Sequence, residues 1–252
     1  SGALGTRLDA AESQISQLTT QQLKARANVI LDGLICWIDA AGKTNSDSDK
    51  ATITDLSGNG KNATLTNFAW TAESGYCGNV LVLDGVDDIV VVNSLTPYMN
   101  ADKSFSLEIV LNIKQASTTY TQLMRNATDH ARAFVIRSAY RTVGLNNGGL
   151  LFGYDEATYP DVFPSSDAAQ GQIPSVTGKH HFVFVFTTTT MTIYYNGLFF
   201  RSCALVRGNN PTYGLDVAVG QRDFYAFRGY SKALSAEEVA QNYAVEKVRW
   251  GL

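Results

Sequence analysis

Short strand-like segments, separated by turn signals, fill most of this chain and restrict it to an all-β fold. Between Phe105 and Ile113 every second residue is Phe, Leu or Ile, a period of two that places these side chains on one face of a strand. The other face is expected to be half wet. His181–Phe186 is apolar on both faces and is expected to be central in its sheet. Asn196-Gly197 predicts a tight hairpin, because both central residues of a type I′ turn need positive φ.

The composition agrees with a globular β protein and argues against two kinds of partner. Hydrophobic residues make up 45% of the 252 residues, enough for a substantial core. Charged residues make up 17% and the net charge is −3, so we expect no nucleic acid as a partner. No run of about 18 apolar residues is present, so we expect no membrane insertion. Cys36 and Cys77 leave one disulfide open, as an alternative to buried thiols.

Residues 1–32 carry a helical heptad pattern instead of a strand pattern. Apolar positions alternate in spacings of four and three, which is the a/d seam of a coiled coil. The seam consists of Leu4, Leu8, Ala11, Ile15, Leu18, Gln22, Ala25 and Val29. A solitary helix of this length is marginal in water, so we favour a coiled-coil stalk over a surface helix on its own domain. Asp32-Gly33 is expected to end the helix, with the globular domain at 33–252.

The last segment of the chain has the pattern of a capped helix. Ser235 followed by Glu238 forms a capping-box sequence. One apolar face is then marked by Ala236, Val239, Ala240, Tyr243 and Trp250. The pattern predicts a short C-terminal helix with this face on the globular domain.

Three segments resemble one family of β-sandwich modules. Asp55–Thr64 and Val82–Val91 are tight polar turns that lead into apolar runs, and Gly229–Val239 contains the helix start. In this order they resemble the concanavalin-A-like, laminin-G-like jelly-roll modules, over about residues 34–246. The resemblance implies that the C-terminal helix packs close to where the chain enters the sandwich, with Trp250 anchoring the tail. The predicted fold is therefore all-β, a concanavalin-A-like jelly-roll sandwich with an N-terminal coiled-coil helix and a short C-terminal helix.

The sequence lacks the carboxylate pattern of a glycan hydrolase. Retaining glycosidases hold two carboxylates about 5–5.5 Å apart, which on a strand requires acids spaced by two or four residues. Glu108 stands alone in its predicted strand, and the adjacent Asp155 and Glu156 point apart if extended. We therefore predict that the chain is not an enzyme and has no catalytic residues. A glycan hydrolase with unconventional carboxylates is kept as an alternative.

No metal site is predicted. His180 and His181 are adjacent in a strand, so they face opposite sides and cannot readily share one ion. Several members of the resembled family hold Ca²⁺ at the sandwich rim with oxygen ligands. Here such oxygens would come from Asp55, Asn59, Asp84, Asp87 and Asp88. Because short Asp and Asn side chains also cap tight turns, we expect no cofactor, with calcium kept as an alternative.

Aromatic and charged residues gather in three predicted loops, at 154–163, 221–225 and 137–141. Saccharides are recognised by aromatic rings, which stack on the apolar face of the sugar, and by polar groups, which bind its hydroxyls. The predicted ligand-binding residues are Tyr154, Asp155, Tyr159, Arg222, Tyr225 and Tyr140. Tyr and Arg are also common anchors of protein interfaces, so contact with neighbouring subunits is an alternative, as is folding back onto the sandwich ends.

A stalk that carries a jelly roll resembles the distal part of a bacteriophage tail-fibre or baseplate protein. The resemblance implies a receptor-binding module that recognises cell-surface saccharide, in the virion tail or outside the cell. We expect a homotrimer, because adhesins of this architecture are usually trimers, and contacts with other tail or baseplate proteins. Linked sites gain about 10²–10⁴ in avidity over one site. A structural virion scaffold that contacts only other proteins is the alternative.

Overall fold

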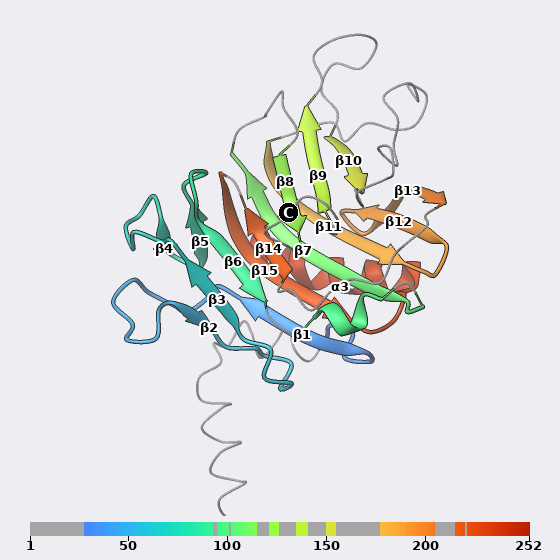
Figure 1. The fold of residues 1–252 in the computed structure, drawn as a ribbon, viewed down its shortest axis with the longest axis horizontal. Helices are drawn as coiled ribbons and strands as arrows, with labels where there is room; N and C mark the ends of the chain where they lie inside the picture. Colours follow the sequence, from blue (N-terminus) through green and yellow to red (C-terminus); the bar gives the residue numbers. More distant parts are fainter. Residues whose placement is uncertain are drawn as a thin grey trace, which may run out of the picture.

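Two antiparallel β-sheets packed face to face form the body of the protein (Figure 1). The computed structural model describes residues 28–92, 95–100, 102–114, 121–125, 135–140, 150–154, 177–204, 215–219 and 221–252. Within them the helices are α3 (Ala236–Trp250) and the short 3-10 helix η1 (Thr96–Tyr98). The predicted all-β sandwich and its short C-terminal helix are confirmed.

The larger sheet has its longest strands at its centre. Across this sheet the order is β13 (Leu198–Ala204), β12 (Thr190–Tyr195), β11 (Gly178–Phe186), β7 (Phe105–Ile113), β15 (Arg222–Tyr230), β5 (Val80–Leu83) and β4 (Gly75–Cys77). β1 (Leu34–Asp39) also belongs to this sheet and pairs with β15. The apolar segment from His181 to Phe186 lies in β11, between β7 and β12, so its predicted central position is confirmed.

The smaller sheet covers the other side of the core. Its order is β10 (Leu150–Tyr154), β9 (Val135–Tyr140), β8 (Thr121–Arg125), β14 (Leu215–Val219), β6 (Ile89–Val92), β3 (Ala63–Thr66) and β2 (Thr52–Ile53). Sheet order therefore puts the β9–β10 pair at one edge and the β2–β3 pair at the other edge, and Figure 1 shows β10 and β4 on opposite sides of the molecule.

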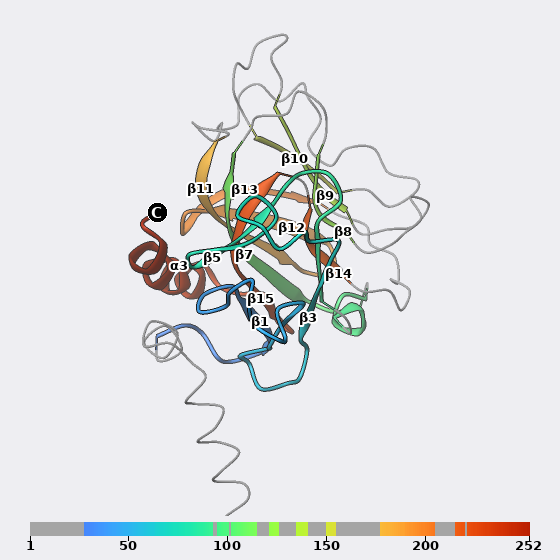
Figure 2. The same cartoon turned by 90° about the vertical axis from the view of Figure 1, so that its left-hand side faces the viewer.

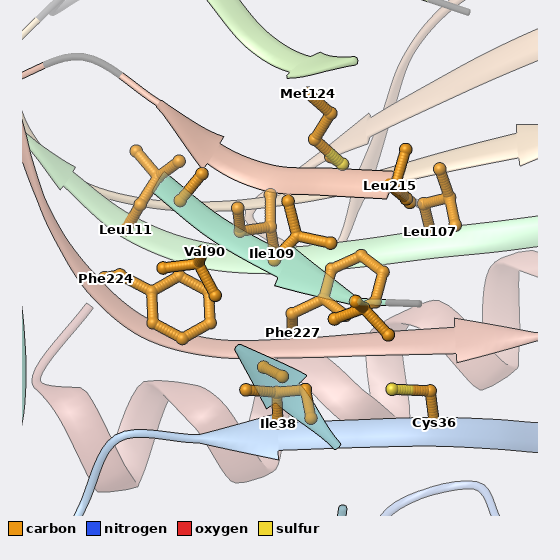
Figure 3. Close-up of a cluster of buried hydrophobic side chains, with 14 of the residues drawn as sticks. Cys36, Ile38, Val90, Leu107, Ile109, Leu111, Met124, Leu215, Phe224 and Phe227 are labelled. Atoms are coloured by element: carbon orange, nitrogen blue, oxygen red, sulfur yellow. The ribbon is translucent and has the colours of Figure 1, made fainter. Parts of the chain in front are cut away.

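The core lies between the two sheets and follows the predicted alternation of β7. Side chains of both sheets meet there, among them Leu107, Ile109, Leu111, Phe224, Phe227, Val90, Met124 and Leu215 (Figure 3). Phe105 and Phe186 occupy paired positions of β7 and β11, and their rings stack with centroids 4.5 Å apart. Removal of this apolar surface from water is the main driving force for forming the sandwich.

The outer face of β7 is buried too, which corrects the prediction of a half-wet face. Ser106, Glu108 and Val110 are all buried, although they alternate with the core residues. Helix α3 lies across the outer side of the larger sheet (Figure 2). The Ser106 hydroxyl donates to the carbonyl of Lys232 and accepts from the Leu234 amide, in the segment that leads into α3. The alternation in β7 gave no indication that this face is covered, because the covering segment and α3 lie more than a hundred residues further along the chain.

The chain enters the sandwich beneath α3. Residues 28–33 contain turns and no helix, so the expected helix end at Asp32-Gly33 is wrong. Val29, predicted in the coiled-coil seam, is buried against Trp37. The Ile30 amide donates to Asn242 Oδ1 of α3 at 2.8 Å. The implied packing of the C-terminal helix near the chain entry is therefore confirmed. The other seam residues, Leu4 to Ala25, lie outside the described residues.

The two strongest local signals are confirmed. Asn196 and Gly197 both have positive φ, at 48° and 77°, in the hairpin between β12 and β13. A Cβ atom on Gly197 would lie 2.6 Å from the Tyr243 ring, so glycine is also required by packing against α3. Ser235 and Glu238 form the capping box of α3, and Trp250 is buried with its ring edge-to-face on Tyr225.

The structure also bears on the two cysteines and on membrane-spanning helices. Cys36 is buried and Cys77 is exposed, and both are free, so the disulfide left open between them is not formed. Among the described residues, no helix has the length and apolar character needed to cross a membrane.

Candidate functional site

The residues predicted to bind ligand do not form one cluster within the described residues. Tyr154 ends β10 opposite Ile136, whereas Tyr140 ends β9 opposite Leu150, so the two tyrosines occupy opposite ends of this strand pair. Asp155 and Tyr159 lie outside the described residues. Ligand binding by these four residues stays a prediction.

Arg222 and Tyr225 lie in strand β15, so their predicted placement in a loop is wrong. Arg222 is 3% exposed and burial lowers its pKa to about 10. Tyr225 is 6% exposed, with Trp250 against its ring. The neighbouring Asp223 accepts from Asn112 Nδ2 at 2.9 Å and pairs with Lys114 at 2.7 Å. These partners explain why the charged Asp223 occurs in a buried strand. The burial of Arg222 and Tyr225 argues against them as first contacts of a ligand.

Three of the residues named for the calcium alternative come together in the turn between β5 and β6. One carboxylate oxygen from each of Asp84, Asp87 and Asp88 lies within 4.8 Å of the others. Asp88 accepts from the Asp84 amide and from Ser74 Oγ, and Asp84 accepts from the Val86 amide. The bonds from the Asp84 and Val86 amides are turn caps. Burial raises the pKa of Asp88. Calcium binding here stays an alternative to the prediction of no cofactor.

Asp55 belongs to a different turn. Its carboxylate accepts from the Trp37 amide at 2.8 Å, and from the amides of Ser57 and Lys61 at 2.9 Å each. The side chain of Asn59 donates to the carbonyl of Leu34. Asp55 and Asn59 therefore fix the turn after β2 onto β1, which is the turn-capping role expected for them.

An aromatic group at the surface, beside β4, was not predicted from the sequence. Trp70 is partly exposed, and its ring lies 5.6 Å from that of Phe68 and 6.1 Å from that of Tyr76. The Lys50 ammonium lies 5.2 Å from the centroid of the Trp70 ring, in a cation–π arrangement. We call Phe68, Trp70, Tyr76, Lys50 and Asn45 the Trp70 corner.

The backbone of the Trp70 corner is held in an unusual conformation. Trp70 has φ +62° and Asn67 has φ +69°. Positive φ in a bulky residue is uncommon and costs about 1–3 kcal/mol, and such residues concentrate at functional sites. Asn45 fixes the loop from the other side: its Nδ2 donates to the carbonyls of Thr71 and Tyr76, at 3.2 and 3.1 Å, and its Oδ1 accepts from the Tyr76 amide at 2.7 Å.

The acidic residues of the adjacent loop, between β1 and β2, are engaged within the loop itself. Asp47 accepts from the amide and the hydroxyl of Thr44, at 2.9 and 2.7 Å, and these bonds lower its pKa. Asp49 pairs with Lys43 at 2.6 Å. The ammonium of Lys50 instead lies over the ring of Trp70, so the corner combines a partly exposed indole with a cation.

A second polar cluster lies buried between the larger sheet and α3. Glu108 Oε1 lies 2.8 Å from His181 Nε2 and accepts from Arg228 Nη1 at 2.8 Å. Glu108 Oε2 accepts from Asn242 Nδ2 at 2.8 Å and from the Tyr230 hydroxyl at 3.3 Å. The carboxylate that stands alone in its strand thus has four partners from β11, β15 and α3.

The cluster continues along α3 to the start of the domain. Arg228 Nη2 and the Trp250 indole N–H both donate to Glu246. Arg249 donates to Glu246 and also to Asp39 at the end of β1. We call Glu108, His181, Arg228, Tyr230, Asn242, Glu246, Arg249 and Asp39 the α3 network. Because these groups are nearly all engaged with one another and sealed from water, the network stabilises the docking of α3.

The electrostatics of the α3 network follow from burial and pairing. Burial raises the pKa of Glu108, but the Arg228 guanidinium and the His181 hydrogen bond lower it more strongly, to about 2. Burial raises the pKa of Asp39, and Arg249 opposes this effect. Glu108 is therefore a permanently charged anchor near neutral pH.

Comparison with known proteins identifies the architecture alone. Neither a protein-family model nor a curated protein matches the sequence. Among solved structures, a Trypanosoma rangeli sialidase in complex with sialic acid matches with TM-score 0.55 and 12% identity, over 85% of this chain and 33% of the sialidase. The binding domain of botulinum neurotoxin DC in complex with SialylT matches with TM-score 0.58 and 14% identity, over 85% of this chain and 52% of that chain.

A third match is nearly complete on both sides. Domain 4 of AbnA, a GH43 extracellular arabinanase from Geobacillus stearothermophilus in complex with arabinotriose, matches with TM-score 0.54 and 14% identity, over 83% of this chain and 98% of that chain. The chain thus spans one third of the sialidase and about half of the toxin domain. At these identities the matches define a β-sandwich fold.

The prediction that the chain is not an enzyme is wrong, because the sequence does not exclude enzymatic activity. Sialidase chains share this architecture over most of the present chain, at 12% identity. The search for paired carboxylates along single strands was therefore too narrow a criterion, because it presupposed one type of hydrolase on this fold.

Proposed function

We propose that this protein is a carbohydrate-binding β-sandwich module. The observation that carries the proposal is the shared architecture: solved structures with this fold contain sialic acid, SialylT and arabinotriose. The Trp70 corner supports it, because a partly exposed indole is a suitable platform for the apolar face of a sugar ring.

The finer proposal is that the module binds receptors in a phage tail or baseplate, as a homotrimer that recognises cell-surface saccharide. Its support is the heptad pattern from Leu4 to Ala25, which would bundle three chains and present three weak sites together. Contacts with other tail or baseplate proteins, and a location in the virion or outside the cell, belong to the same proposal.

A glycan array that includes bacterial wall polysaccharides tests the saccharide proposal. We expect reproducible binding to a restricted set of glycans. Silence across the array, combined with tight binding to a neighbouring virion subunit, would contradict the proposal and favour the scaffold alternative.

Two variants test the predicted loop at 154–163. Tyr154→Ala and Tyr159→Ala should weaken adsorption to cells while leaving the melting curve unchanged, with Thr158→Ala in the same loop as the matched control. Adsorption equal to wild type in both tyrosine variants would remove this loop from the proposal.

Sedimentation tests the trimer. The wild-type chain should sediment as a trimer at micromolar concentration, and Ile15→Asn at a seam position should dissociate it. Gln14→Asn, one position outside the seam, is the matched control and should remain trimeric. A monomeric wild-type chain would refute this part of the proposal.

A further inference from the structure

We infer that the Trp70 corner is a binding site for an acidic sugar: the exposed part of the indole packs against the apolar face of the pyranose ring, and the Lys50 ammonium turns from the indole to the sugar carboxylate. The inference rests on the proposed function. It adds a second subsite to the one predicted in the loop at 154–163, which follows β10. The corner lies beside β4, on the opposite side of the molecule from β10 (Figure 1). The ligand class is a saccharide with a sialic acid or a uronic acid residue.

Trp70 differs from the other two tryptophans in its access to solvent. Trp37 is 0% exposed, beneath the Arg228 guanidinium, and Trp250 is 6% exposed, against Tyr225. Trp70 is partly exposed, at the end of the sandwich where two loops meet. It is thus the indole that a ligand can reach without displacing helix α3.

The corner is also built before any ligand arrives. Trp70 has positive φ, and its ring packs against the core through Phe68 and Tyr76. The three hydrogen bonds of Asn45 tie the loop between β1 and β2 to the loop that carries Trp70. A platform fixed in this way loses little conformational entropy when a sugar binds.

The charge at the corner selects the ligand class. Asp47 is hydrogen-bonded to Thr44 and Asp49 pairs with Lys43 within their own loop. Burial raises the pKa of Tyr76, and both carboxylates add to this rise. The Lys50 ammonium is the charged group that lies directly over the indole. A carboxylate next to a stacked sugar ring would form a charge-assisted hydrogen bond with Lys50. A neutral sugar would gain the stacking contact alone, so the corner favours acidic sugars.

Acrylamide quenching of tryptophan fluorescence reports on this site, because Trp37 and Trp250 are buried. The probes are 3′-sialyllactose, with lactose as its neutral counterpart, and trigalacturonate, with galactotriose as its neutral counterpart. At least one acidic probe should shield Trp70 and reduce the quenching constant about twofold, and its neutral counterpart should not. The two acidic arms distinguish sialic from uronic acid. Raising the salt concentration should weaken the effect.

Variants link the shielding to the named groups. Lys50→Gln should lower affinity for the acidic probe about tenfold, the loss of one charge-assisted hydrogen bond. Lys103→Gln, an exposed lysine elsewhere on the surface, is the matched control and should bind like wild type. Trp70→Phe retains an aromatic ring and should bind about threefold to tenfold more weakly, with an unchanged melting midpoint as evidence that the corner is folded.

The outcomes separate this inference from the proposed function. Binding of an acidic probe with no shielding of Trp70, or with equal affinity in Lys50→Gln and wild type, would overturn the acidic subsite and leave carbohydrate binding in place. Tighter binding of the neutral probes would overturn the ligand class. Failure to bind any glycan on the array would overturn the proposed function and this inference together.

Discussion

Among the described residues a cation lies over a tryptophan ring in three places, and two of them, at Trp37 and at Trp70, have different roles. In the α3 network the Arg228 guanidinium carbon lies 4.7 Å from the centroid of the Trp37 ring, and both residues are fully buried. In the Trp70 corner the Lys50 ammonium lies 5.2 Å from the Trp70 ring, at the surface. The same pair of groups therefore stabilises the fold in one case and is available to a ligand in the other.

The difference lies in what surrounds the cation. Arg228 is held by the carboxylates of Glu108 and Glu246, so its charge is neutralised within the protein. The ring beneath Lys50 is instead fixed by the uncharged Asn45 and by strained backbone. A buried charge with two counter-charges has no capacity left for a partner, whereas a surface ammonium over a ring can accept an anion at small desolvation cost.

The largest effect is expected when the α3 network is broken. Glu108→Gln removes one of the two counter-charges of the buried Arg228, and should lower the free energy of unfolding by about 3–5 kcal/mol. Urea denaturation at pH 7 measures this loss. A loss below about 1 kcal/mol would mean that water or rearrangement compensates Arg228, and the network would lose its stabilising role.

Acid should weaken the same network. The pKa of Glu108 is about 2 in the fold and about 4.3 in the unfolded chain, so its contribution of about 3 kcal/mol is complete above about pH 5 and is lost as the pH falls toward 2. Asp39 has a raised pKa and contributes in the opposite sense. Arg228 and Glu246 are the other charged groups around Glu108, and the His181 imidazole is hydrogen-bonded to it.

The difference between wild type and Glu108→Gln isolates the Glu108 contribution, because Asp39 is common to both. Urea denaturation at pH 7, 5, 4 and 3 should give a difference in unfolding free energy that shrinks steadily below about pH 5. A difference that stays constant across this range would show that Glu108 does not carry the acid sensitivity.

An intermediate effect is expected at the scaffold of the Trp70 corner. Asn45→Ala removes three hydrogen bonds to Thr71 and Tyr76, and should lower the free energy of unfolding by about 2 kcal/mol. Binding of an acidic saccharide should fall with it, because the strained loop is released. Asn79→Ala, an exposed residue in the turn after β4, is a suitable control. Full retention of stability and binding would show that Asn45 does not organise the corner.

The smallest effect on stability is expected for the surface cation itself. Lys50→Gln should change the free energy of unfolding by less than about 0.5 kcal/mol, as surface substitutions usually do. Thermal and urea denaturation measure it. A loss comparable with that of Glu108→Gln would place Lys50 among the structural groups and remove the contrast between the two regions.

Local patterns predicted those parts of the fold whose causes are local. The alternation of β7, the Asn196-Gly197 hairpin and the capping box at Ser235 are each specified by adjacent residues, and all three are confirmed. Charged residues in β15 were mistaken for a loop, because the partners that permit their burial, such as Asn112 of β7 for Asp223, lie far away in the sequence.

The α3 network and the Trp70 corner depend on long-range contacts, so local sequence patterns did not predict them. Glu108 stands alone in its strand, yet its partner Asn242 comes from a helix 134 residues away. The positive φ of Trp70 and the anchoring of its loop by Asn45 become apparent only in three dimensions. A lone tryptophan in a polar loop between short strands was the signal that could have found the corner.

Hydrogen–deuterium exchange with and without a saturating acidic saccharide tests the contrast between the two regions most directly. We predict slower exchange in the segments 43–50 and 67–76, which contain the Trp70 corner, and unchanged exchange in α3. Protection confined to α3, or protection elsewhere with none in these two segments, would contradict the account.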